Sequence, residues 1–177
     1  MDKQLVPLIS KPEIAATVQR LAQELDRNYA NSAPIVIGVL KGSFIFLADL
    51  IRQMQTPIRN VELMRLSSYG CATNSSGEVK ILMGLSEGII NNQDVILVED
   101  IVDTGLSTTT AIELLKTHNP ASVKLCALLD KPSRRKIPVQ IDYLGIEIPD
   151  RFIVGYGIDM DEKYRQLPAI YTIETDN

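Results

Sequence analysis

Short apolar runs alternate with amphipathic stretches along most of the chain, and this alternation predicts strands interleaved with helices. Ser10 and Glu13 have the spacing of a helix capping box, and apolar residues recur at helical intervals from there to Asn28. The run IVIGVL at 35–40 is too short and too rich in β-branched residues for a helix, whereas the pattern at 44–54 is helical. The first third of the chain is therefore expected to fold as helix, strand and helix.

The same alternation continues to the end of the chain. We expect strands at 60–66, 79–83, 94–98, 122–130, 141–148, 152–158 and 169–173, and a further helix at 106–118. This order predicts one α/β domain with a mainly parallel central sheet flanked by helices on both faces. Ligands bind beyond the carboxyl ends of the strands in such sheets, so the loops that follow 35–40, 94–98 and 122–130 are the places to look for function.

Composition and charge narrow the class of protein. The chain has 177 residues, 45% of them hydrophobic and 23% charged, which suits one soluble globular domain. The net charge of −4 argues against general binding to nucleic acids or anionic membranes, because both need a basic face. Arg134 and Arg135 are interpreted as part of a solvated basic turn. No apolar run approaches the roughly 20 residues of a membrane span, and the start does not resemble a signal peptide, so a cytoplasmic protein is expected.

The cysteine and histidine content argues against several kinds of site. Cys71 and Cys126 lack the spacing of a zinc site or a disulfide framework, and both are interpreted as free thiols. His118 is the only histidine and lies at the end of a predicted helix, where a capping role is expected. A histidine-dependent catalytic triad is therefore excluded.

The segment VILVEDIVDTGLSTTT at 95–110 contains the chemistry that needs explaining. Gly105, followed by hydroxyl residues at the start of a predicted helix, is typical of a site for one phosphate group. Glu99, Asp100 and Asp103 would repel that phosphate unless they contact sugar hydroxyls or a magnesium ion on the same ligand. A Walker-type phosphate loop is excluded, because GxxxxGK[ST] does not occur.

The segment VILVEDIVDTGLST resembles the phosphoribosyl diphosphate motif of type I phosphoribosyltransferases. GVLKGSFIFLADL, RLSSYG with SSGEVKIL, LLDKPSRR and PDRFIVGYGIDMDEKYRQLP are similar to the hypoxanthine-guanine branch, particularly its bacterial form, and occur in the same order from about Ile35 to Pro168. The resemblance implies the type I fold, with a core at about 30–140 and a small hood formed by the N-terminal segment and about 141–177. It also implies a mobile active-site loop at about 67–80.

The resemblance also implies a role for each matching residue on the sugar-phosphate side. The 5-phosphate would bind at Asp103, Thr104, Gly105, Leu106, Ser107 and Thr108, with Leu106 standing where mammalian relatives carry lysine. Glu99 and Asp100 would face the ribose hydroxyls and a Mg²⁺ cofactor, and Asp159 would be a second acid linked to the metal. Lys41 and Gly42, after a cis peptide bond that does not involve proline, would contact diphosphate together with Arg165.

On the purine side, Asp103 would be the general base at N7 and Lys131 would donate a hydrogen bond to O6. Phe152 would stack on the base, and Ile153 and Asp159 would lie near its C2 edge. Ser68 and Tyr69 would belong to the loop that closes over the reactants.

The reaction implied by the resemblance is purine salvage. The phosphoribosyl group would pass from 5-phospho-α-D-ribose 1-diphosphate to N9 of hypoxanthine or guanine, in a homodimer or homotetramer. Two alternatives stay open at this point, a receiver-type signalling module and a regulatory relative that binds RNA. The order of preference among hypoxanthine, guanine and xanthine also stays open, because recognition at C2 depends on loop geometry.

Overall fold

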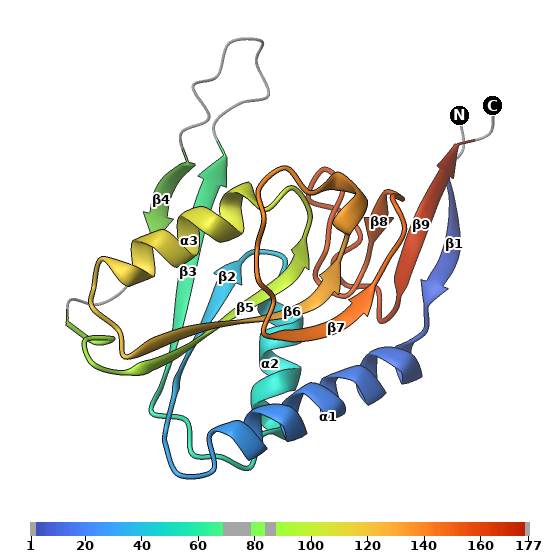
Figure 1. Cartoon of the computed structure of the whole chain (residues 1–177). Helices are drawn as coiled ribbons and strands as arrows, with labels where there is room; N and C mark the ends of the chain where they lie inside the picture. Colours follow the sequence, from blue (N-terminus) through green and yellow to red (C-terminus); the bar gives the residue numbers. More distant parts are fainter. Residues whose placement is uncertain (1–2, 69–78, 84–87, 176–177) are drawn as a thin grey trace.

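The computed structural model describes residues 3–68, 79–83 and 88–175 (Figure 1). The helices are α1 (Lys11–Asn28), α2 (Phe44–Gln53) and α3 (Leu106–Lys116), with one 3-10 turn, η1 (Pro132–Arg134). The strands are β1 (Lys3–Ile9), β2 (Ile35–Leu40), β3 (Asn60–Ser68), β4 (Val79–Met83), β5 (Asp94–Val102), β6 (Ser122–Asp130), β7 (Tyr143–Glu147), β8 (Ile153–Val154) and β9 (Ile170–Thr175). The capping box predicted for the first helix is present, because Ser10 and Glu13 each bond the other's backbone N–H.

The main sheet has the strand order β4-β3-β2-β5-β6-β7. Every pairing in it is parallel except that of β3 with β4, so the predicted mainly parallel α/β fold is confirmed. A second sheet of order β1-β9-β8 is antiparallel and lies beside the carboxyl ends of the main strands (Figure 1). Because β1 and β9 pair, the two ends of the chain are joined in one small sheet.

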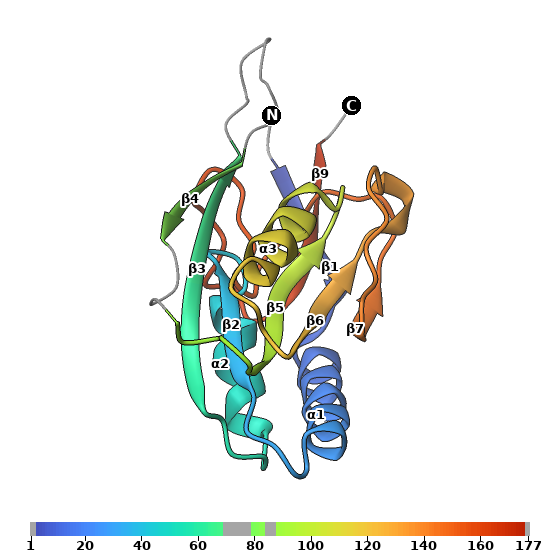
Figure 2. The same ribbon diagram turned by 60° about the vertical axis from the view of Figure 1, so that its left-hand side comes forward.

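Helices cover both faces of the main sheet, as predicted (Figures 1 and 2). On the face of α1 and α2, Leu21, Leu25 and Phe46 pack with Val98 of β5 in one apolar cluster. On the face of α3, Leu97 of β5 packs with other buried apolar side chains in a second cluster, to which Ala111 and Leu115 of α3 belong. Alternate residues of the central strand therefore serve opposite cores, which fixes the register of the strands that carry the site.

Three local predictions need correction. No strand was predicted at 3–9, where β1 forms by pairing with the distant β9. The strand predicted at 94–98 continues to Val102, so Glu99 and Asp100 lie within it. The strand predicted at 152–158 is only two residues long, because Gly155, Tyr156 and Gly157 have φ angles of 103°, 50° and 97° and turn the chain.

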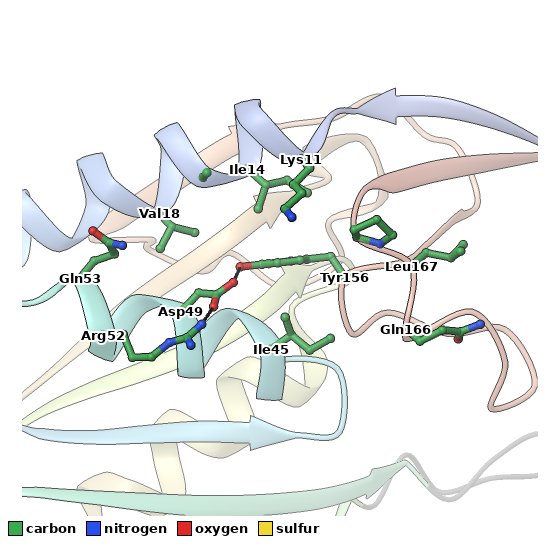
Figure 3. A pocket seen from close by; sticks show the side chains of 12 residues that line it. Lys11, Ile14, Val18, Ile45, Asp49, Arg52, Gln53, Tyr156, Gln166 and Leu167 are labelled. Atoms are coloured by element: carbon green, nitrogen blue, oxygen red, sulfur yellow. Dashed lines mark hydrogen bonds and ion pairs between the residues drawn. The ribbon is translucent and has the colours of Figure 1, made fainter.

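The turn at 155–157 is tied to α2 through a tyrosine. The Tyr156 hydroxyl donates a hydrogen bond of 2.6 Å to Asp49, whose other oxygen pairs with Arg52 (Figure 3). Burial and this hydrogen bond raise the pKa of Tyr156, so the hydroxyl stays protonated and remains a donor. A cavity of about 440 Å³ surrounds the pair between α1, α2 and the segment 156–168, and none of the predicted site residues that the structure describes lines it.

Several predictions fall outside the described residues. Tyr69 and Cys71 belong to this group, as does most of the predicted active-site loop at 67–80. The division into a core and a hood stays a prediction. Cys126 is buried in β6 as a free thiol, as expected. Within the described ranges, no helix is both long enough and apolar enough to span a membrane.

Candidate active site

Parallel pairing of β2 with β5 and of β5 with β6 brings the ends of these three strands to one edge of the sheet. The loops that leave this edge begin at Lys41, Asp103 and Lys131, and they face the small antiparallel sheet (Figure 1). Most of the residues predicted for the site therefore lie in one region, at the place where ligands bind in sheets of this type.

The segment 103–108 has the backbone geometry of a phosphate site. Gly105 precedes α3 with a φ of 87°, a left-handed conformation that glycine adopts without strain. The carbonyl of Thr104 accepts hydrogen bonds from the backbone N–H groups of Lys136 at 2.9 Å and Ile137 at 3.1 Å, which anchor the turn. The first N–H groups of a helix have no partner within it, so those of α3 can donate to an anion at this end of the dipole, where the N–H of Leu106 makes only a long hydrogen bond of 3.4 Å to the Thr104 hydroxyl.

We expect Gly105→Ala to destabilise the protein. A Cβ atom at this position would lie 2.5 Å from the carbonyl oxygen of Ile137, and the left-handed backbone is unfavourable for alanine. The free energy of unfolding should fall by about 2 kcal/mol, measured by chemical denaturation. Gly88→Ala is the matched control, because Gly88 also has a positive φ, of 73°, but no atom of the described residues lies within 4 Å of the place that its Cβ would take. Equal losses in the two variants would show that backbone strain alone acts and that the contact with Ile137 is unimportant.

The two adjacent acids of β5 point to opposite faces of the sheet. Glu99 is only 4% exposed and accepts a hydrogen bond of 3.4 Å from the hydroxyl of Thr108 in α3. Asp100 points the other way, towards Gly42, where a Cβ atom would overlap its carboxylate. Burial, supported by the charge of Asp100, raises the pKa of Glu99 well above its usual range. Burial also raises the pKa of Asp100, to about 6, against the opposing effect of backbone hydrogen bonds.

Asp103 is the first residue of the phosphate segment, by which we mean residues 103–108, and one of its carboxylate oxygens lacks a hydrogen-bond partner within the described part of the chain. Its Oδ1 atom is buried and accepts no hydrogen bond from any described residue. Nε of Arg134 lies 3.5 Å from that oxygen, which is close enough for an ion pair but long for a hydrogen bond. The Asp103 side chain as a whole is 38% exposed, so the carboxylate can still accept a proton or hydrogen bond from a ligand that approaches from solvent.

Two cations meet on the other side of the site. The peptide bond between Leu40 and Lys41 is cis, as the resemblance implied. Nζ of Lys41 donates to Glu162 at 2.7 Å, and the guanidinium of Arg165 contacts the same carboxylate at 2.9 Å. Arg165 also pairs with Asp159 at 2.8 Å and donates to the carbonyl of Gly157 at 2.8 Å. Hydrogen bonds from Lys41 and Arg165 lower the pKa of Glu162 to about 2, so this carboxylate is ionised at neutral pH.

Asp100 and Asp159 are the pair of acids that suits a magnesium ion. The negative charge of Asp159 contributes to the raised pKa of Asp100, which places the two carboxylates within electrostatic reach of each other. No cluster of three or more possible metal ligands occurs in the ranges that the structure describes. Magnesium needs only one or two protein carboxylates when phosphate oxygens and water complete its coordination, so the donor set fits. Glu99 points away from this pair, towards α3.

Three residues predicted for purine binding are Lys131, directly after β6, Phe152 and Ile153. Lys131 is 4% exposed, and its Nζ donates a hydrogen bond of 2.7 Å to the carbonyl of Arg151. Phe152, the next residue in the chain, is 54% exposed, whereas Ile153 is buried in β8. The buried ammonium group is therefore bound to the residue that precedes an accessible aromatic side chain, and these two groups would suit a planar ligand with an acceptor on its edge.

Comparison with known proteins identifies the family of the chain. The family model described as "Phosphoribosyl transferase domain" matches residues 8–161. The chain belongs to the phosphoribosyltransferase family. Two curated relatives of this phosphoribosyltransferase are the hypoxanthine-guanine phosphoribosyltransferase of Bacillus subtilis and the hypoxanthine phosphoribosyltransferase of Salmonella typhimurium. The first is 45% identical and covers 92% of this chain and 89% of its own; the second is 42% identical and covers 92% of each.

Solved structures confirm the type I phosphoribosyltransferase fold. A crystal structure of a hypoxanthine-guanine phosphoribosyltransferase from Bacillus anthracis superposes with a TM-score of 0.89 at 40% identity. The match covers 98% of this chain and all of the other. A hypoxanthine phosphoribosyltransferase from Staphylococcus aureus gives the same TM-score at 39% identity, over 95% of this chain and 90% of the other.

Sequence reasoning about this phosphoribosyltransferase missed two contacts and misread one residue. It did not single out Glu162, which contacts both Lys41 and Arg165, or the approach of Arg134 to Asp103. The interpretation of Arg135 as a solvated residue is wrong, because its guanidinium pairs with Asp130 and only 16% of the side chain is exposed. An acid five positions before an arginine, across Pro132, was the available signal for that pair.

Proposed function

We propose that this phosphoribosyltransferase transfers the 5-phosphoribosyl group of 5-phospho-α-D-ribose 1-diphosphate to N9 of hypoxanthine, giving IMP and diphosphate, and that it also accepts guanine. Relatives with these names support the proposal over nearly the whole chain. The observation that carries it is the arrangement of one anion cradle at 103–108, one pair of cations formed by Lys41 and Arg165, and the buried Lys131 around one edge of the sheet. The anion cradle matches the 5-phosphate of the donor, the cation pair matches its diphosphate, and Lys131 matches the oxygen of a 6-oxopurine.

The donor is proposed to bind with its two phosphate ends on different elements. The 5-phosphate accepts hydrogen bonds from the backbone N–H groups of the segment 104–108 and from the hydroxyl groups of Thr104 and Ser107. The hydroxyl of Thr108 is buried and donates to Glu99, so Thr108 contributes through its backbone, as Gly105 and Leu106 do. Leu106 is 42% exposed, and its apolar side chain adds no donor to the site. Lys41, Gly42 and Arg165 bind the diphosphate. The positive charges of Lys41 and Arg165 complement its negative charge, and Gly42 contributes its backbone.

The purine is proposed to bind between Phe152 and Lys131. The Lys131 ammonium donates to O6, Phe152 stacks on the ring, and Ile153 and Asp159 lie towards the C2 edge. Lys131 is held in place by its hydrogen bond to the Arg151 carbonyl, which fixes where the purine oxygen is bound.

Asp103 is the proposed general base. It accepts the proton from N7 as N9 attacks the anomeric carbon, so that positive charge does not accumulate on the purine. Its side chain is 38% exposed at the edge of the sheet where the ligand would bind, which supports this role. As the bond to diphosphate breaks, positive charge develops on the ribose, and the carboxylate of Asp100 stabilises that charge. Glu99, predicted for the same role, is buried on the other face of β5 and accepts the hydrogen bond of Thr108 instead.

Magnesium is the proposed cofactor. Asp100 and Asp159 would hold the ion, and Glu99, also predicted as a ligand, lies on the other face of β5. When bound, the ion would neutralise negative charge on the leaving diphosphate. Asp100 must be ionised to hold a cation, which the charge of Arg165 favours by lowering the pKa of Asp100 against the effect of burial.

The decisive experiment is to measure diphosphate release. The full chain is mixed with Mg²⁺, phosphoribosyl diphosphate and hypoxanthine, guanine or xanthine in turn, and both diphosphate and nucleotide are quantified. We expect stoichiometric release with hypoxanthine and guanine, and release with xanthine to be much slower. Absence of release with every 6-oxopurine would contradict the proposal.

Other parts of the proposal rest on the relatives or on sequence. Ser68 ends β3 and Tyr69 lies outside the described residues, so their role in closing the site stays a prediction. Assembly into a homodimer or homotetramer is proposed on the apolar character of α2 and the exposure of Phe44 at its start. A receiver-type module or an RNA-binding regulatory relative is not favoured, because no feature of the described site calls for either.

A further inference from the structure

Glu162 contacts both of the cations that the proposed function assigns to diphosphate. One carboxylate oxygen accepts a hydrogen bond from Lys41 at 2.7 Å, and the other contacts Arg165 at 2.9 Å. Lys41 follows β2 and Arg165 lies near the carboxyl end of the chain, so Glu162 bridges two segments that are far apart in sequence. A carboxylate with one oxygen on each cation resembles one phosphoryl group bound between the same two donors.

The three side chains differ in how firmly they are held. Arg165 is fixed by Asp159 and by the carbonyl of Gly157, and its side chain is 18% exposed. The backbone of Glu162 is fixed as well, because its N–H donates to Asp159 at 2.9 Å. The Glu162 side chain, by contrast, is 63% exposed and has the two cations as its partners. It can turn into solvent without moving the backbone or Arg165.

We propose that Glu162 sets the affinity of the donor site for diphosphate, because its carboxylate holds the place of a phosphoryl group between Lys41 and Arg165. The inference rests on the proposed function, because that function assigns the two cations to diphosphate. Binding of the donor or of product diphosphate displaces the carboxylate, and its return favours product release. Glu162 therefore lowers the affinity for free diphosphate and keeps the cations paired when the site holds no ligand.

Titration calorimetry with inorganic diphosphate and Mg²⁺ tests the inference directly on the full chain. Glu162→Gln keeps the size of the side chain but removes its charge, so we expect diphosphate to bind about threefold to tenfold tighter, the range expected for the loss of two partly exposed ion pairs. The KM for phosphoribosyl diphosphate should fall in parallel, and the KM for hypoxanthine should stay within about twofold.

Asp161→Asn is the matched control. Asp161 is exposed and adjacent, and its φ of 52° is one that asparagine tolerates. This variant removes the same charge from the same loop without removing the Glu162 contacts, so its affinity for diphosphate should stay within about twofold of the wild type. If both variants bound diphosphate more tightly by the same factor, the loss of one negative charge from the loop would explain the effect, and the inference would be overturned.

Unchanged or weaker binding of diphosphate by a folded Glu162→Gln variant would also overturn the inference, because it would make Glu162 an organiser of the cations. Glu162→Asn supplies a second test if the first variant unfolds, since asparagine tolerates the φ of 62° at this position and carries no charge, so it should also tighten binding. The titration needs no purine and no turnover. A wild-type chain that binds diphosphate but releases none from the donor would contradict the proposed function and leave the role of Glu162 to be decided by the titration.

Discussion

Replacing Asp103 with asparagine is expected to lower turnover by about 100-fold to 10,000-fold, the usual contribution of a positioned general base. Asparagine has nearly the same size and can fill the same place at the start of the phosphate segment. It cannot take the proton from purine N7, however, because its amide is not basic. The backbone donors of 104–108 are unaffected, so the affinity for IMP should stay within about tenfold of the wild type. Turnover comes from steady-state kinetics with hypoxanthine, and affinity from titration calorimetry with IMP.

Asp94→Asn is the control for this variant. Asp94 lies at the other end of β5 and accepts a hydrogen bond from Ser122 at 2.6 Å, which asparagine can also accept. Turnover of this control should match the wild type. Parallel losses of turnover and IMP affinity in Asp103→Asn would contradict the assignment and would make Asp103 a structural residue of the turn. Unchanged turnover would remove it from the mechanism altogether.

The parts of the site that could be predicted from sequence are those encoded locally. Asp103, Gly105 and Thr108 lie within one short segment, and the order of strand, glycine turn and helix fixes their arrangement wherever that segment is placed. The opposite directions of Glu99 and Asp100 follow from the alternation of a strand, but the strand had been expected to end before them. Once β5 is known to continue to Val102, the alternation of side chains along a strand assigns Glu99 and Asp100 to opposite faces of the sheet.

Contacts between distant segments could not be predicted in the same way. The pair formed by Lys41 and Glu162 joins residues 121 positions apart, and its formation depends on the turn at 155–157 that lies against α2 and Gly42. Pairing of β1 with β9 likewise joins the two ends of the chain, and nothing in the alternation of either segment specifies the partner. Such contacts depend on the packing of the whole domain, so they cannot be predicted from local hydrophobic patterns.

The ammonium group of Lys131 is buried at the end of β6, and its loss should weaken purine binding by an amount that can be estimated. At 4% exposure, its ammonium group is shielded from water and lies 4.0 Å from Asp150, with the Arg151 carbonyl as its hydrogen-bond acceptor. An ammonium group has three donors, so hydrogen bonds remain available for a purine oxygen. A hydrogen bond from a charged donor contributes about 1.5–3 kcal/mol, which corresponds to a factor of about 10 to 150 in affinity.

Lys131→Met should therefore raise the KM for hypoxanthine by about 10-fold to 100-fold while the KM for phosphoribosyl diphosphate stays within about threefold. Methionine fills most of the buried volume, so packing is preserved and the ammonium is the main loss. Steady-state kinetics with each substrate varied in turn measures both constants, and Lys136→Met, at an exposed neighbouring lysine, is the control. Similar increases in the two KM values would contradict a purine-specific role. They would indicate a general disturbance at the end of β6, which would also displace the segment 103–108, because this segment follows β5 and β5 pairs with β6.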